Sequence, residues 1–281
     1  GPIAPMVAGL TILTLLIVDR RRLLGNLRIP VGVLVVAAVC LPWYVAIYLA
    51  TDGAFYTAAI GKDFLGKAAG GQEGHGAPPL VHLAFFFGVG WPMAAFAAAA
   101  VWRVVKMRGP VFLFAFAWVV PAWIVFELTP TKLPHYTLPL LPGIAIAAVA
   151  SLSQAAPPRW LRVLAGVMIL AAPLVILLAG PFLVGALAGM APESADLFTR
   201  TPILAALVLI LIALAAAIVA AIRVWRGVGM VSSAVVGPAV AAAVIAQTAV
   251  WGLALPSFEP VWISTRLVAA AEAAAPCERP R

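Results

Sequence analysis

The sequence predicts an all-α integral membrane protein with about eight transmembrane helices. Of its 281 residues, 64% are hydrophobic and 10% are charged, with a mean hydropathy of +1.10. Soluble domains are roughly 45–50% apolar and about 25% charged. The apolar residues form runs of about 17 to 24 residues, each long enough to cross a hydrocarbon core of about 30 Å as a helix. These runs lack the alternation of polar and apolar residues that is typical of a membrane β-barrel.

The eight apolar runs define the expected spans. In chain order they cover residues 3–18, 30–49, 80–101, 111–127, 137–152, 161–183, 202–222 and 231–253. We expect one polytopic transmembrane domain over residues 1–253. The remaining residues, 254–281, would form a periplasmic tail or the start of a truncated domain.

The charges in the connecting loops support this count and give an orientation. One set of alternate loops holds eleven of the 18 basic residues beside a single acid, Asp19. The other set holds the remaining seven basic residues together with nine acids. Because Lys and Arg concentrate in cytoplasmic loops, the first set is expected in the cytoplasm. Its basic residues are Arg20, Arg21, Arg22, Arg28, Arg103, Lys106, Arg108, Arg159, Arg162, Arg223 and Arg226.

The net charge of +8 is therefore a signal of topology, with some attraction to anionic lipid headgroups. No basic domain lies outside the spans, so we expect no nucleic-acid partner. Cys40 lies within a span and Cys277 in the tail, which leaves no disulfide framework or thiolate metal site to argue. The chain opens on Gly1 directly before its first span, without a signal peptide, so we expect it to be an internal or C-terminal fragment.

The longest outer loop, residues 50–79, reads "ATDGAFYTAAIGKDFLGKAAGGQEGHGAPP". Its first part, residues 53–69, is expected to form an interfacial helix with Lys62, Asp63 and Lys67 facing water or headgroups. Four glycines then surround Glu73 and His75, and Pro78 and Pro79 open the next span. His75 could ligate a divalent cation with carboxylate oxygens, or could be a solvated loop histidine. His82, inside "LVHLAFFF", is better read as a packing histidine near the interface.

The next outer loop contains "TPTKLPHYTLPLLP", residues 129–142. Its prolines interrupt helical hydrogen bonding at membrane depth, where exposed backbone usually lines a cavity or contacts a ligand. Lys132 could pair with a phosphate and Tyr136 could donate its hydroxyl to the same group. Alternatively, Lys132 extends to the interface and Tyr136 belongs to an aromatic belt. Glu127 is either an acid at a span end or a partner of Lys132.

Taken together, three segments resemble a known family. They are "LPWYVAIYLATDGAFY", "GKDFLGKAAGGQEGHGAPP" and "ELTPTKLPHYTLPLLPGIA". Their order resembles the middle of the polyprenyl-phosphate-sugar-dependent membrane glycosyltransferases of family 83, the relatives of lipid A aminoarabinose transferase. The protein O-mannosyltransferases are more distantly similar. The resemblance covers most of residues 1–150, whereas residues 151–281 match only as helices of the right kind.

This resemblance implies an integral membrane fold of the GT-C type in the bacterial inner membrane, with functional loops in the periplasm. The enzyme would transfer a sugar from undecaprenyl or decaprenyl phosphate to a lipid, glycan or protein acceptor. The family's Lys-x-Pro-x-Tyr feature falls on Lys132, Pro134 and Tyr136, which implies contacts with the carrier phosphate. Its His-x-x-Pro feature falls on His75 and Pro78, where relatives bind a divalent metal cation, with Glu73 as a neighbour. Gly76 replaces a basic residue that some relatives use as a second phosphate contact.

The family's catalytic acid lies in an outer loop that would precede Gly1, so the catalytic residue is unknown in this chain. The implied reaction is a direct displacement at the anomeric carbon with polyprenyl phosphate as leaving group. We expect the chain alone to be inactive, since a general base would still be needed. A transporter or lipid flippase is the alternative from another class, because broken helices with polar groups at membrane depth occur there too. A non-catalytic membrane scaffold is a third possibility.

Overall fold

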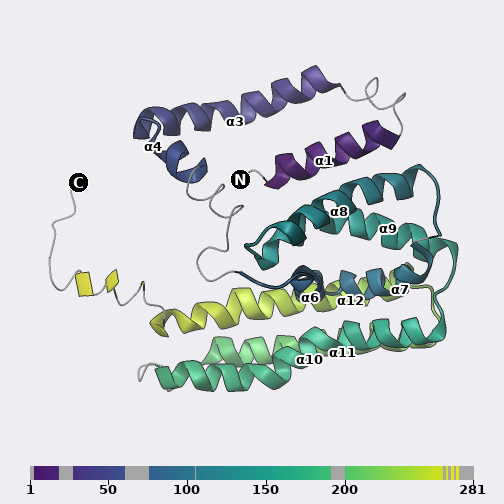
Figure 1. The fold of residues 1–281 in the computed structure, drawn as a ribbon. Helices are drawn as coiled ribbons and strands as arrows, with labels where there is room; N and C mark the ends of the chain where they lie inside the picture. The colour runs from purple at the N-terminus through teal and green to yellow at the C-terminus, as the bar shows by residue number, and fades with distance from the viewer. Residues whose placement is uncertain are drawn as a thin grey trace. The chain divides into compact units, whose positions relative to one another are not determined.

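Apart from one isolated β-bridge, the regular elements of the computed structural model are helices in the part of the chain that it describes (Figure 1). The chain divides into two compact units. The first unit is Gly1–Gln154 and the second is Ala155–Arg281. The described residues are 3–18, 28–60, 76–104, 106–190 and 200–261, with Ser264, Leu267, Val268, Ala270 and Ala271.

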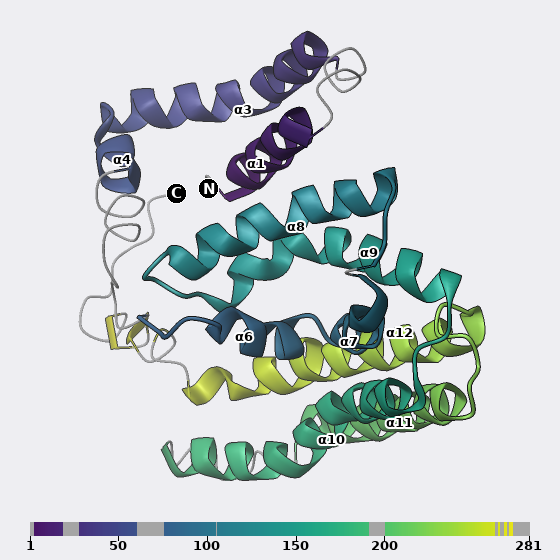
Figure 2. The same cartoon turned by 45° about the vertical axis from the view of Figure 1, so that its right-hand side comes forward.

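The first unit holds the helices that build the site. They are α1 (Ile3–Val18), α3 (Ile29–Thr51), the single turn α4 (Ala54–Tyr56), α6 (Val81–Val89), α7 (Met93–Val104), α8 (Pro110–Leu128), the 3-10 helix η2 (Pro134–Leu140) and α9 (Leu141–Gln154). Proline stands in the first turn of α3, α8 and η2, where its missing N–H costs no hydrogen bond. In both views α8 and α9 lie side by side (Figures 1 and 2).

The second unit is a bundle of three long helices. They are α10 (Arg159–Met190), α11 (Thr201–Trp225) and α12 (Ser233–Gln247), and the last continues into the π-helical turn η5 (Thr248–Ala254) and the 3-10 helix η6 (Leu255–Val261). The helix α11 packs on both α10 and α12. Figure 2 shows the three helices running alongside one another.

The all-α membrane fold predicted from the sequence is confirmed. In the described ranges, six helical segments are long and apolar enough to cross a membrane, while Ile3–Val18 and Met93–Val104 are apolar but shorter. One expected span is wrong in detail, because residues 80–101 form two helices, α6 and α7, in place of one. Pro92 has no backbone N–H to continue a helix across this point, and Gly90 ends α6. Each of the other seven runs coincides with helical structure.

Only the first part of the interfacial helix expected over residues 53–69 lies within the described residues. The chain turns at Asp52 and Gly53, both with positive φ, and is helical from Ala54 to Ile60. Lys62, Asp63 and Lys67 lie outside the described residues. A hydrogen bond from the Tyr56 hydroxyl to the Tyr44 carbonyl folds this turn back onto the end of α3.

Buried apolar side chains and small residues together hold the helices of the first unit. Ala122 and Phe126 of α8 are buried with Val7 of α1 and Leu140 of η2, and Trp118 and Trp123 pack around them. The helices α7 and α9 meet through alanines, and Ser151 Oγ donates a hydrogen bond of 3.2 Å to the Ala100 carbonyl. Within a membrane, such close contacts replace the hydrophobic effect as the force that holds helices together.

The second unit uses an alanine-rich seam with helical spacing. On α11 a buried stripe recurs every three or four positions and is joined by Ala221 beside it: Ala206, Ile210, Ala213, Ala217, Ala220 and Val224. On α12 a matching stripe is buried: Val235, Ala239, Ala242 and Ala246. Large apolar side chains on the other faces stay exposed, for example Leu211 and Val244, as expected for surfaces in contact with lipid tails.

The packing of α10 on α11 depends on Gly166. A Cβ added at Gly166 would overlap the indole of Trp225, whose Nε1 donates a hydrogen bond to the Val163 carbonyl. We predict that Gly166→Ala lowers the free energy of unfolding by about 1–3 kcal/mol, because the indole must move. Thermal unfolding in detergent would measure this. The matched control is Gly180→Ala on the same helix, where no atom of the described residues lies within 4 Å of the added Cβ. Equal stability of the two variants would contradict the prediction.

Candidate functional site

The loop between α8 and α9 is shaped by its prolines. Helix α8 ends at Leu128, and Thr129 is extended because the residue before Pro130 disfavours helical angles. Leu133 is extended for the same reason, and Pro134 then starts the 3-10 helix η2. The loop therefore turns back over the end of α8. It places Lys132 beside carbonyl groups that have no partner within the helix.

The Lys132 side chain closes the C-terminal end of α8. Its Nζ donates hydrogen bonds to the carbonyls of Phe126 at 3.1 Å and Thr129 at 2.8 Å, and also to the carbonyl of Glu127. The residue is only 5% exposed. An ammonium has three donors, so this arrangement uses all of them. A cation is also favoured at the negative end of a helix dipole.

Glu127 joins this cluster from the last turn of α8. Its Oε2 accepts a hydrogen bond of 2.9 Å from the Leu80 backbone N–H and lies 3.8 Å from Lys132 Nζ. Its Oε1 lies 3.7 Å from Nδ1 of His82. The expectation that Glu127 could be a partner of Lys132 is confirmed. The carboxylate also reaches a segment 47 positions earlier in the chain, which the sequence did not indicate.

The segment before α6 lies against the loop that carries Lys132. Gly76 pairs with Thr131 in an isolated antiparallel bridge, and Leu80 is bound by Glu127. Thr131 is fully buried in this contact. The two loops that resemble family motifs are thus adjacent where both are described. Pro78 lies between these two contact points.

Aromatic rings surround Tyr136. The Tyr136 ring is stacked on His82 with centroids 6.1 Å apart and planes at 25°, and it lies 5.6 Å from the Phe126 ring. His82 is fully buried, and neither ring nitrogen has a hydrogen-bond partner among the residues that the structure describes. The burial of His82 among aromatic rings agrees with its predicted role as a packing residue. Its place beside both Tyr136 and Glu127 was missed, since nothing local in "LVHLAFFF" indicates it.

Some of the residues predicted for the site are described by the structure and others are not. Lys132, Pro134 and Tyr136 lie together in one loop, with Pro78 in the adjoining segment. Glu73 and His75 lie outside the described residues, so the predicted metal site stays a prediction. The remainder of the chain that is described holds no group of three or more His, Cys, Asp or Glu side chains able to hold a metal ion.

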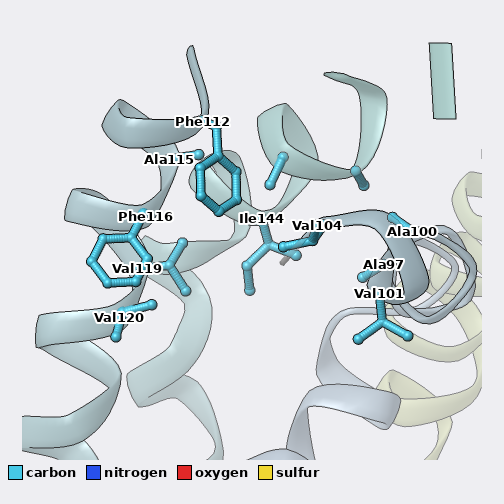
Figure 3. A pocket seen from close by; sticks show the side chains of 12 residues that line it. Ala97, Ala100, Val101, Val104, Phe112, Ala115, Phe116, Val119, Val120 and Ile144 are labelled. Carbon is cyan, nitrogen blue, oxygen red and sulfur yellow. The ribbon is translucent and has the colours of Figure 1, made fainter. Parts of the chain in front are cut away.

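An apolar cavity of about 210 Å³ lies among α7, α8 and α9. Phe112, Phe116, Val119 and Val120 of α8 face it from one side, and Ala97, Val101 and Val104 of α7 from the other, with Ile144 of α9 between them (Figure 3). The described residues that line it include no charged side chain, so it is suited to hydrocarbon and not to phosphate.

No family model and no curated protein matches the chain. The crystal structure of ArnT from Cupriavidus metallidurans bound to undecaprenyl phosphate is similar, with a TM-score of 0.63 at 20% identity. The similarity covers 98% of this chain and 47% of that one, so the chain spans about half the length of that ArnT. The likeness shows the fold, which is the GT-C membrane fold implied by the sequence resemblance.

The hydrogen bonds from Lys132 to the carbonyls at the end of α8 should stabilise the fold. We predict that Lys132→Met lowers the free energy of unfolding by about 1–3 kcal/mol, because the α8 carbonyls lose their donors in a buried setting. Methionine keeps an unbranched stem of similar length. The matched control is Lys106→Met, which changes an exposed lysine. The prediction is contradicted if the two variants melt at the same temperature in detergent.

Proposed function

We propose that this chain is part of a membrane glycosyltransferase that takes a sugar from a polyprenyl phosphate, and that Lys132 and Tyr136 bind the carrier phosphate. The observation that carries the proposal is the convergence of both motif-bearing loops on the end of α8, through Gly76–Thr131 and Leu80–Glu127. The similar ArnT fold, described with undecaprenyl phosphate bound, supports the same substrate class.

Lys132 would contribute by exchanging one hydrogen-bond partner. Its three donors are held by carbonyls, but an anionic phosphate oxygen is a stronger acceptor than a neutral carbonyl. The Thr129 carbonyl is the one to be replaced, because it lies in the loop and can turn toward water. The carbonyls of Phe126 and Glu127 would stay bound, so the helix end remains closed.

Tyr136 would provide a second contact from a fixed ring. Stacking on His82 and contact with Phe126 hold its phenol in one orientation, so the hydroxyl can donate to a phosphate at little entropic cost. The half-buried position of the ring excludes water from part of the site. Both contacts would strengthen as charge grows on the departing phosphate during direct displacement at the anomeric carbon.

We assign no general base to the described side chains, and the sugar and the acceptor are not specified by this cluster. A divalent cation on His75 and Glu73 is also proposed, on the family resemblance alone. In the same proposal, transfer takes place at the periplasmic face of the inner membrane. The isoprenoid tail would run along the helices, with the cavity among α7, α8 and α9 taking part of it.

Phosphate binding is tested by Tyr136→Phe, which removes one hydroxyl and keeps the stacked ring. We expect the affinity for undecaprenyl phosphate to fall about two- to tenfold, the loss of one hydrogen bond. Lys132→Ala should cost more, about tenfold or above, because it also removes the charge. Binding in lipid nanodiscs would measure both. Tyr48→Phe on α3 is the matched control and should bind as tightly as the unchanged chain. Full affinity in Tyr136→Phe and Lys132→Ala would contradict the proposal.

Binding of the tail is tested by filling the cavity. We expect Ala97→Phe to lower the affinity for undecaprenyl phosphate several-fold, because the ring occupies space proposed for isoprenoid units. Farnesyl phosphate, with a much shorter tail, should bind Ala97→Phe and the unchanged chain alike. Val149→Phe, at a half-exposed position on α9, is the control for the added ring. An equal loss for both ligands would argue against tail binding in this cavity.

A further inference from the structure

Glu127 occupies a position that helix physics disfavours. It lies in the last turn of α8, where the helix dipole is negative and a carboxylate is destabilised. Its side chain is mostly buried, with 14% exposed. A buried carboxylate at this end of a helix needs compensating partners. Its Oε2 has them in the Leu80 N–H and the Lys132 ammonium, and its Oε1 lies 3.7 Å from His82 Nδ1.

Leu80, the residue that Glu127 binds, has a strained backbone. Its φ of 70° and ψ of 2° place a leucine in the left-handed region, which costs roughly 1–2 kcal/mol for a residue with a Cβ. Such strain persists only where surrounding contacts impose it. The 2.9 Å hydrogen bond to Glu127 is such a contact. Leu80 is also the residue at which the chain turns from the non-helical segment after Gly76 into α6.

This turn determines what lies beneath Tyr136. His82 follows Leu80 by two residues and supplies the ring on which Tyr136 is stacked. On the other side of Leu80, Gly76 pairs with Thr131, the neighbour of Lys132. Holding Leu80 in its strained conformation therefore fixes both ends of residues 76–82 against the loop that carries Lys132 and Tyr136.

We propose that Glu127 is a positioning residue of the carrier-phosphate site, which acts by clamping Leu80 in its left-handed conformation and so holds His82 beneath Tyr136. The inference rests on the proposed function. Glu127 makes no contact with the phosphate itself. Its carboxylate holds the segment 76–82 and balances the charge of Lys132 while the site is empty.

The test uses the strain at Leu80. Glu127→Ala should weaken undecaprenyl phosphate binding about tenfold, because Leu80 relaxes and His82 shifts. Glycine adopts the left-handed region without strain, so adding Leu80→Gly should restore the affinity to within about threefold. Glu127→Gln keeps an oxygen acceptor for the Leu80 N–H and should retain most of the affinity. Asp52→Gly is the matched control, since Asp52 also has a positive φ but lies in another turn, and it should restore nothing.

Hydrogen exchange of residues 76–82 supplies a readout that does not depend on the ligand. The Leu80 amide should be protected in the unchanged chain and in Glu127→Gln, and should exchange faster in Glu127→Ala. Unchanged exchange in Glu127→Ala, or failure of Leu80→Gly to restore affinity, would overturn the positioning role. If the unchanged chain binds no undecaprenyl phosphate, the proposed function fails, while the exchange data still decide whether Glu127 clamps Leu80.

Discussion

The closure of the α8 C-terminus by Lys132 is the interaction on which the rest of the site depends. Carbonyls at the end of a membrane helix find no water in hydrocarbon, so another group must satisfy them. The Lys132 ammonium does so with all three of its donors. This fixes the return of the loop over α8, and with it the positions of Thr131 and Tyr136. The segment that contains Gly76 and Leu80 then has a defined surface to pack against.

The side chains around Tyr136 pair one cation with one carboxylate, and they include a buried imidazole whose nitrogens lack hydrogen bonds within the part of the chain that the structure describes. Lys132 faces Glu127, and among the described residues the ring nitrogens of buried His82 make no hydrogen bond, although Nδ1 lies 3.7 Å from Glu127 Oε1. A phosphate arriving at Tyr136 would find a cation whose partners can be exchanged and a flat aromatic face already in place. Binding would therefore need little rearrangement of the helices, which suits the proposed role of stabilising charge that develops on the phosphate. The purely apolar cavity near Phe112 and Phe116 offers none of this chemistry.

The helices could be predicted from run length and hydropathy, because a span must be apolar over its whole length. Lys132 and Tyr136 could be singled out as candidate site residues, because polar side chains among prolines at membrane depth are unusual. Their role in binding stays a prediction. The break at Pro92 within one apolar run was harder to predict, because the run is hydrophobic on both sides of it. The contacts of Glu127 with Leu80 and of His82 with Tyr136 could not be predicted from the sequence. They join positions 47 and 54 residues apart, and only the packed fold brings them together.

A structure of the chain with undecaprenyl phosphate in a lipid nanodisc, determined by electron cryomicroscopy, would test the central claim most directly. The account predicts phosphate density at the Tyr136 hydroxyl, with Lys132 Nζ turned from the Thr129 carbonyl toward it. Glu127 should still hold the Leu80 amide. Phosphate density elsewhere, for example against the exposed Arg159 and Arg226 of the second unit, would contradict it.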